Sequence, residues 1–201
     1  MTVPLGRRER KKAATRQKIA DTALRLFLER GYEAVGIRDV AAEADVAVTT
    51  LFSHFASKEA LVFERDDDFE QRLTGAVTDR APGEPLVAAL RREVRSMVRH
   101  CTADGAAPIF RMIDGSPALR EYEESMRLRH AESLAAAIGA DPGLSRGTTA
   151  DRAMARFVID AYALARAASD PDAALDEIFR MIEAAWAGAR PSGDSTGEAG
   201  L

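Results

Sequence analysis

The sequence predicts an all-α protein with a three-helix, helix-turn-helix domain at its N-terminus and a helical bundle after it. Apolar residues recur at three- and four-residue spacing in nearly every stretch between breakers. The chain is 46% hydrophobic but only 6% aromatic, which favours helices with small interfaces over a sheet. Clusters that contain proline and glycine, such as residues 81–85, separate these helical stretches.

Between residues 35 and 61 two short amphipathic helices flank a tight turn at residues 43–46. The first is expected to bury Ile37, Val40, Ala41 and Ala44, which share one helical face. The second is expected to bury Val48, Leu51, Phe52 and Phe55 and to leave Thr49, Thr50, Ser53 and His54 at or near the outside. Helices joined by so short a turn cross steeply, as in the helix-turn-helix whose second helix enters the DNA major groove.

A longer segment, residues 15–62, resembles the DNA-binding domain of the tetracycline-repressor (TetR) family of transcriptional regulators. The resemblance lies in TRQKIADTALRLFLERGYEAVGIRDVAAEADV followed by AVTTLFSHFASKEAL. The helix spacing, the Glu-Arg-Gly-Tyr step, the Thr-Leu-Phe pattern and the Phe-x-Ser-Lys-Glu-x-Leu step agree without a gap. The rest of the chain carries no motif and fits the family only in length and helical content.

The resemblance implies a dimeric regulator that binds a double-stranded DNA operator, most simply a repressor released by a small-molecule effector. In this family the exposed side of the second short helix meets base edges, and its C-terminal part meets phosphates. Threonine hydroxyls suit bases or phosphates, and short polar or basic side chains suit phosphates. The candidate DNA-binding residues are therefore Arg38, Val48, Thr49, Thr50, Ser53, His54 and Lys58. For His54 the alternative is packing against the following helix.

Three positions depart from the family pattern. The turn glycine is Asp45, which tolerates a left-handed backbone better than most residues. The hydroxyl cap of the second short helix is Ala47, at a cost of about 1 kcal/mol. The frequent phosphate-binding tyrosine is Phe52, which has no hydroxyl and is expected in the core.

The charge distribution separates the N-terminal part of the chain from the remainder. Net charge is −4 overall, yet residues 1–65 hold 12 basic and 9 acidic residues, while the rest holds 16 and 23. Residues 1–18 hold seven basic residues and one acidic residue. This asymmetry is typical of a DNA-contacting end on an acidic body, although a solvated basic tail on any protein would look similar.

Residues 1–14 are expected to form a flexible basic arm around RRERKK, acting either as a phosphate or minor-groove contact or as a solubilising tail. A helix should follow from Thr15, as its cap, to Arg30, and Gly31 should end it. The predicted domains are this arm, a DNA-binding domain at 15–61, a ligand-binding and dimerisation body at 62–188, and a disordered tail at 189–201.

In the body, a long helix is expected to run unbroken from Ser57 to about residue 80. Further helices are expected at residues 86–102, 108–113, 117–138, 149–169 and 171–188. The resemblance implies that the last two pair with their copies in a homodimer. Their candidate dimer residues are Ala153, Phe157, Ala161, Leu164, Ala165, Ile178, Met181, Ile182, Ala185 and Trp186, which could equally be monomer core.

The remaining helices should enclose an effector pocket. Methionine and phenylalanine suit an adaptable apolar cavity, so the predicted effector is of modest size and largely apolar. The candidate lining residues, each of which could instead be core, are Phe63, Phe69, Met97, Cys101, Phe110, Met112, Ile113, Tyr122 and Met126. The polar candidates are His100, Arg111, Arg127 and His130.

Other classes of protein fit less well. His100, Cys101 and Asp104 could suggest a nucleophile site, but adjacent helical residues face different directions and no supporting pattern accompanies them. The three histidines and one cysteine have no metal-ligand spacing, and no cofactor is expected. No apolar run is long enough for a membrane span, no signal peptide is evident, and a single cysteine fits the cytoplasm. A ligand-independent regulator or an activator with the same DNA-binding domain remains the alternative.

Overall fold

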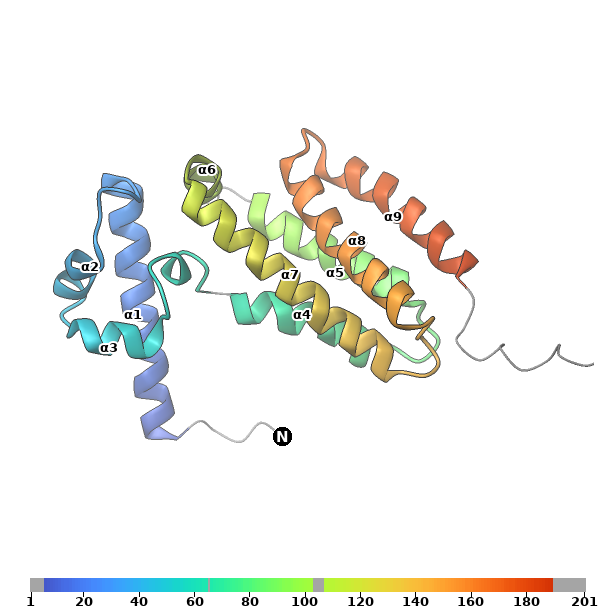
Figure 1. Cartoon of the computed structure of the whole chain (residues 1–201), viewed down its shortest axis with the longest axis horizontal. Coiled ribbons are helices and arrows are strands. Elements are labelled where there is room, and N and C mark those ends of the chain that lie inside the picture. Colours follow the sequence, from blue (N-terminus) through green and yellow to red (C-terminus); the bar gives the residue numbers. More distant parts are fainter. Residues whose placement is uncertain (1–5, 65, 103–106, 190–201) are drawn as a thin grey trace, which may run out of the picture. The chain divides into compact units, whose positions relative to one another are not determined.

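The computed structural model describes residues 6–64, 66–102 and 107–189, and these form nine α-helices and one 3-10 helix. The helices are α1 (Arg7–Arg30), α2 (Ile37–Glu43), α3 (Val48–His54), η1 (Glu59–Leu61), α4 (Asp66–Thr78), α5 (Leu86–Thr102), α6 (Ala107–Gly115), α7 (Pro117–Ala140), α8 (Thr148–Ala167) and α9 (Pro171–Gly188) (Figure 1). The predicted all-α class is confirmed. None of the helices in these ranges has both the length and the apolar character needed to cross a bilayer.

The chain divides into two compact units. Among the described residues, the head unit comprises 6–64 and 108–122, and the body unit comprises 66–102, 107 and 123–189. Residues 108–122 had been predicted to belong to the body. In the structure Ile113 and Leu119 are buried in the head core, and the Ser116 hydroxyl donates to Glu33 at 2.8 Å. Local periodicity predicts that these residues are buried but cannot tell which core receives them.

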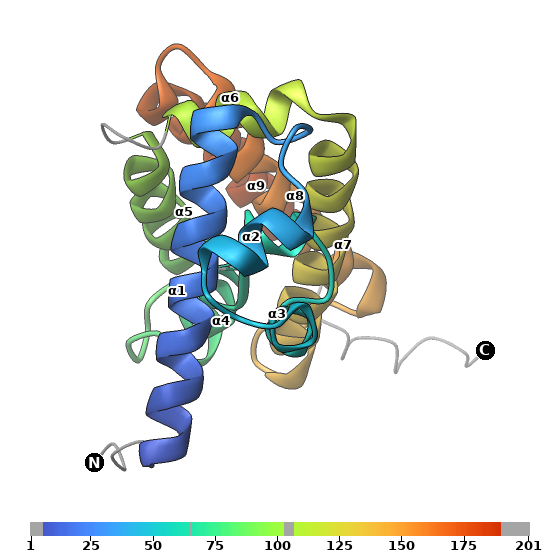
Figure 2. The same ribbon diagram turned by 90° about the vertical axis from the view of Figure 1, so that its left-hand side faces the viewer.

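The head core forms where α1, α2, α3 and η1 meet. Four of its large side chains, Phe27, Leu26, Leu51 and Phe55, are at most 2% exposed. In Figure 2, α2 lies across α1 and the chain leads from it into α3. Gly31 ends α1 with φ of 88°, which L side chains rarely adopt, as its position in the sequence predicts. The head thus presents α3 on a scaffold of well-packed helices.

Helix α1 begins at Arg7, not at Thr15. The predicted flexible arm is therefore wrong for residues 7–14, and its first five residues lie outside the described ranges. The segment RRERKKAAT consists mostly of strong helix formers without a breaker, so the helix continues outward past the core. Because it buries little apolar surface, the hydrophobic pattern does not reveal it.

The turn between α2 and α3 has the bonds of a Schellman motif. The Val46 amide donates to the Ala41 carbonyl at 3.0 Å, and the Asp45 amide donates to the Ala42 carbonyl at 3.1 Å. Asp45 takes φ of 52°, as predicted for the position of the family's glycine. No side chain caps α3 at Ala47, which also agrees with the sequence.

The segment after α3 differs from the prediction. A single long helix had been expected from Ser57, but η1 ends at Leu61 and α4 begins at Asp66. Leu61 is 1% exposed and packs in the head core, whereas Leu73 of α4 packs in the body core. Because Leu61 and Leu73 must be buried in two separate cores, the helix is interrupted between them. No glycine or proline in the sequence indicates this interruption.

The body unit has its own core, to which α4, α5, α7, α8 and α9 contribute. Leu90, Val94, Leu134, Val158 and Leu175 are fully buried there. Helix α9 starts as the sequence predicts, because Asp170 accepts from the Ala173 amide at 3.0 Å and Pro171 follows it.

Candidate nucleic-acid interface

Helix α3 presents a polar outer face. Leu51 and Phe55 anchor the helix in the head core, and Thr49 and Ser53 on the other side are exposed. Val48 and Thr50 are half-buried at the edges of this face, and the Ser53 hydroxyl donates to the Thr50 carbonyl at 2.7 Å. Five of the seven predicted contacts, Val48 to Thr50 together with Ser53 and His54, are thus on one short helix.

Phe52 contradicts the prediction that it is core, because 50% of its surface is exposed. Leu51 and Phe55 already occupy the buried direction, and Phe52 is rotated about 100° from Leu51 around the helix. The prediction was based on the apolar character of phenylalanine and not on the angular position of residue 52 around the helix. An exposed ring beside Thr49 and Ser53 is a further candidate contact, since it can pack against sugar or base without a hydroxyl.

Arg16 of α1 ties the end of α3 to the scaffold. Its Nη1 donates to the His54 carbonyl at 2.5 Å, and its Nη2 donates to the Glu64 carbonyl at 3.4 Å. The guanidinium also lies 4.3 Å from the centre of the Phe55 ring. The His54 carbonyl belongs to the last turn of α3, where carbonyls lack a helical partner. Arg16 therefore fixes where α3 ends, a role that the sequence pattern did not reveal.

His54 is half-buried at the C-terminal end of α3. Burial, and then the positive charges of Lys12 and Arg16, lower the pKa of its imidazole below the ordinary 6.5. The ring is therefore neutral near pH 7. The effect of Lys12 also places the basic start of α1 near this end of α3, so Lys12 joins the candidate surface as part of a helix.

Lys58 does not extend outward as the predicted phosphate clamp. Its Nζ donates to the Tyr32 carbonyl at 2.6 Å and lies 4.0 Å from the centre of the Tyr32 ring. Tyr32 in turn donates to Glu59 at 2.9 Å. These contacts join η1 to the end of α1, so the structure places Lys58 in the scaffold. Arg38, by contrast, is exposed at the start of α2.

The nine predicted effector-lining residues are divided between the two units. Phe63, Phe110, Met112, Ile113 and Tyr122 belong to the head unit, where Phe63 stacks on Tyr122 with ring centres 5.4 Å apart. Phe69, Met97, Cys101 and Met126 belong to the body unit. The prediction grouped them by residue type, which carries no information on the unit that holds each helix.

In the body unit, Phe69 and Cys101 contact Tyr162 of α8, a helix that the sequence predicts only as a dimer helix. The Tyr162 hydroxyl is 2.9 Å from Cys101 Sγ, and its ring packs edge-on to Phe69 at 4.8 Å. Phe69 also stacks on His130 at 5.0 Å. Burial, followed by the neighbouring Cys101, raises the pKa of Tyr162, so its hydroxyl is neutral at physiological pH. These four residues are named the Tyr162 cluster.

Helices α8 and α9 present an apolar surface. Phe157 is 52% exposed, Leu164 60% and Met181 68%, and Ala185 is also exposed. Phe157 and Leu164 are seven residues apart and share a helical face. Ala161 and Ile182, predicted dimer contacts, are instead buried in the body core, as is Ala165, and Ile178 and Trp186 pack partly against it. The inner faces of α8 and α9 therefore pack within the monomer.

The comparisons with known proteins agree on the family. The model of "Bacterial regulatory proteins, tetR family" matches residues 19–64. The transcriptional regulator TcmR of Streptomyces glaucescens is 31% identical over 148 residues, covering 68% of this chain and 66% of TcmR. The transcriptional repressor Rv3405c of Mycobacterium tuberculosis is 33% identical over 134 residues, covering 67% of this chain and 68% of the relative. The chain thus spans about two thirds of the length of these relatives.

Solved structures support the fold over a larger part of the chain. The repressor AlkX from Dietzia matches with a TM-score of 0.60 and 21% identity, covering 86% of this chain and 98% of its own. FadR of Thermus thermophilus, solved with lauroyl-CoA, matches with a TM-score of 0.56 and 19% identity, covering 92% and 100%. These identities support a shared architecture only. With the helix-turn-helix, the family model and the relatives in agreement, the protein belongs to the TetR family of bacterial regulatory proteins.

Proposed function

We propose that this protein is a dimeric, operator-binding repressor that a small, largely apolar effector releases from DNA. The main support is the outer face of α3, where Thr49, Phe52 and Ser53 are exposed on a helix that Leu51, Phe55 and Arg16 hold in place. Such a face carries hydroxyls for bases and phosphates and methyl groups for thymine. A dimer would present two of these helices to successive turns of one duplex, about 34–36 Å apart.

Footprinting on the DNA flanking its own gene tests operator binding. A protected site with two related halves is expected. A variant with Thr49→Ala and Ser53→Ala should protect it about 1,000-fold less well, since two lost base or phosphate contacts in each head of a dimer, at about 1 kcal/mol each, total about 4 kcal/mol. Thr78→Ala, at an exposed position at the end of α4, is the matched control. Equal protection by all three proteins would contradict the placement of the interface on α3.

Operator affinity is expected to rise as the pH falls from 7.5 to 5.5. The imidazole of His54 has a lowered pKa in the free protein, and a nearby phosphate would favour its protonated form, so DNA binding takes up a proton. The gain should reach about tenfold for a dimer with two such groups. Binding titrations at constant ionic strength measure it.

His54→Gln should flatten this dependence, and His100→Gln, at an exposed position of α5, should retain it. An undiminished dependence in His54→Gln would remove His54 from the interface. In the absence of DNA the sign for folding is opposite. A depressed histidine pKa stabilises the fold above the ordinary value of 6.5, and that contribution is lost as the pH falls below it, so melting curves should accompany the titrations.

For the effector, the Tyr162 cluster supports a ligand with an apolar body and one hydrogen-bonding group. Phe69 supplies apolar surface, and the neutral Tyr162 hydroxyl beside Cys101 supplies a donor and acceptor. If the ligand binds one of two conformers and DNA binds the other, ligand binding lowers the affinity for DNA.

A thermal-shift experiment with 1-decanol as the apolar probe and glucose as the polar one tests this. At 100 times its dissociation constant a ligand adds about 2.7 kcal/mol to the unfolding free energy, which raises the melting temperature by roughly 5–11 °C for a chain of this size. The shift with 1-decanol should fall by at least half in Tyr162→Phe and remain in Tyr122→Phe of the head unit. Stabilisation by glucose alone would contradict an apolar effector, and unchanged operator affinity at saturating 1-decanol would contradict its role as an inducer.

A further inference from the structure

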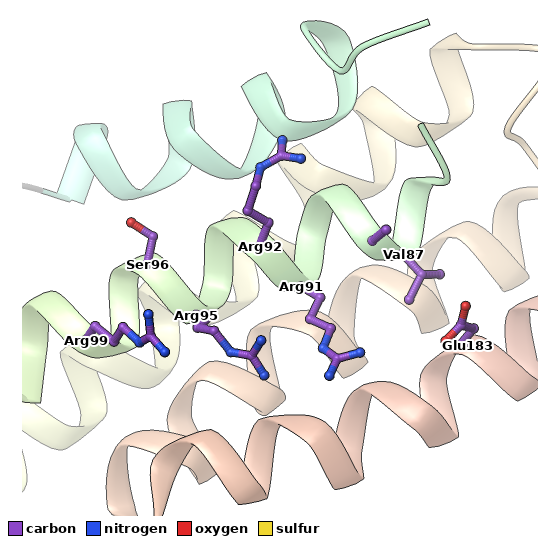
Figure 3. A pocket seen from close by; sticks show the side chains of 8 residues that line it. Val87, Arg91, Arg92, Arg95, Ser96, Arg99 and Glu183 are labelled. Atoms are coloured by element: carbon purple, nitrogen blue, oxygen red, sulfur yellow. The ribbon is translucent and has the colours of Figure 1, made fainter. Parts of the chain in front are cut away.

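Helix α5 carries four arginines along a surface groove that the proposed function does not use. Arg91, Arg92, Arg95 and Arg99, with Ser96, Val87 and Ala88, line the α5 side, and Glu183 of α9 faces them (Figure 3). The groove has a volume of about 720 Å³, within the range of small-molecule sites. Positions 91 to 99 extend about 12 Å along the helix. We name this feature the arginine groove.

Carboxylates on both sides hold the arginines in place. Asp176 of α9 accepts from both Arg91 and Arg95. Asp172 lies 3.1 Å from Arg95 Nε and 3.2 Å from Arg99 Nη2. Arg92 pairs with Glu84, before the start of α5. The hydrogen bond from Arg91, followed by that from Arg95, holds the pKa of Asp176 below its ordinary value, which agrees with a positive local field.

Two of the four arginines remain accessible at the surface of the groove. The Arg92 and Arg99 side chains are 59% and 66% exposed, so they are open to solvent at the groove. The carboxylates thus fix the direction of the arginines without covering them, which is the arrangement that bidentate recognition of phosphate or carboxylate requires.

We propose that the arginine groove binds a small polyanion that carries at least two phosphate or carboxylate groups. Two groups are favoured because the arginines are spread over about two helical turns, farther than one anion reaches. A small ligand is favoured over a nucleic acid, because the groove volume of about 720 Å³ is that of a small-molecule site. The groove involves α5 and α9 and none of the four side chains of the Tyr162 cluster, so this inference is independent of the proposed effector.

Calorimetric titration of the full chain at low salt tests the inference. Pyrophosphate and citrate serve as the phosphate and carboxylate probes, and inorganic phosphate serves as the single-group comparison. We expect pyrophosphate or citrate to bind at least tenfold more tightly than inorganic phosphate. The double variant Arg92→Gln/Arg99→Gln should weaken that binding at least tenfold. It spares Arg91 and Arg95, which tie α5 to α9.

The matched control is Arg129→Gln/Arg152→Gln, which removes the same charge from exposed arginines elsewhere in the body unit. It should bind like the unmodified protein, and melting curves verify that both doubles fold. Absence of binding by both probes, equal binding of inorganic phosphate, or equal weakening in the control would each overturn the proposal. The proposal would also be overturned if non-operator duplex DNA bound the protein through Arg92 and Arg99 while pyrophosphate did not bind.

Discussion

Replacing Leu164 and Met181 together with glutamate is expected to convert the proposed dimer into a monomer and to abolish tight operator binding. Both side chains are more exposed than any other large apolar side chain in the described ranges, at 60% and 68%, and they lie on helices that pack against each other. Burying four charges across a two-fold interface costs several kcal/mol, which a dimer of ordinary strength does not survive. Sedimentation velocity should show a species with the mass of one chain.

Operator affinity should then fall at least about 100-fold, because a monomer can hold only one half-site. Leu128→Glu is the matched control, since Leu128 is a 41% exposed leucine of the body unit that belongs to α7 and not to α8 or α9. It should leave mass and affinity unchanged. Circular dichroism establishes that the double variant is folded. A folded double variant that still sediments as a dimer would show that this surface is not the interface.

Arg16→Ala is expected to cause the second large loss. The change removes a charged hydrogen bond to the His54 carbonyl and the stacking on Phe55. These contacts are worth about 2 kcal/mol in unfolding free energy, to be measured by urea denaturation. The last turn of α3 would also lose its attachment to α1. If each head loses about 1.4 kcal/mol of DNA binding, a dimer loses roughly 100-fold.

Salt dependence separates positioning from direct contact. If Arg16 only positions α3, the slope of log affinity against log salt stays the same, whereas loss of one phosphate contact in each head lowers its magnitude by about 0.9 per head, or about 1.8 for a dimer. Arg25→Ala, on the same helix, is the control, because Arg25 pairs with Glu29 and Glu43 at the surface. Full operator affinity in Arg16→Ala would refute the positioning role.

The sequence predicted those parts of the head that local rules determine. The boundaries of α2 and α3, the left-handed Asp45 and the uncapped Ala47 all follow from residue type and spacing within a few positions. The start of α1 was missed because helix formers that bury nothing leave no apolar period. The prediction that Phe52 is buried is wrong because it relied on the apolar character of the side chain and not on its angular position around the helix.

Other features depend on contacts between distant parts of the chain, which no local pattern encodes. Arg91 and Asp176 are 85 positions apart, and Cys101 and Tyr162 are 61 apart. In the sequence, each of these four residues has only the pattern of an ordinary surface charge or core residue. The same reason explains why Lys58 was assigned to DNA, since its partner Tyr32 lies at the end of another helix.

The backbone angle at Asp45 has a consequence for how this position can vary. A φ of 52° is open to glycine, asparagine and aspartate, but strained for most other residues and worst for β-branched ones. Mutational tolerance at position 45 is therefore narrow although the side chain is exposed and supports no core. Among related sequences, this site should drift among those three amino acids while its solvent-facing neighbours diverge freely.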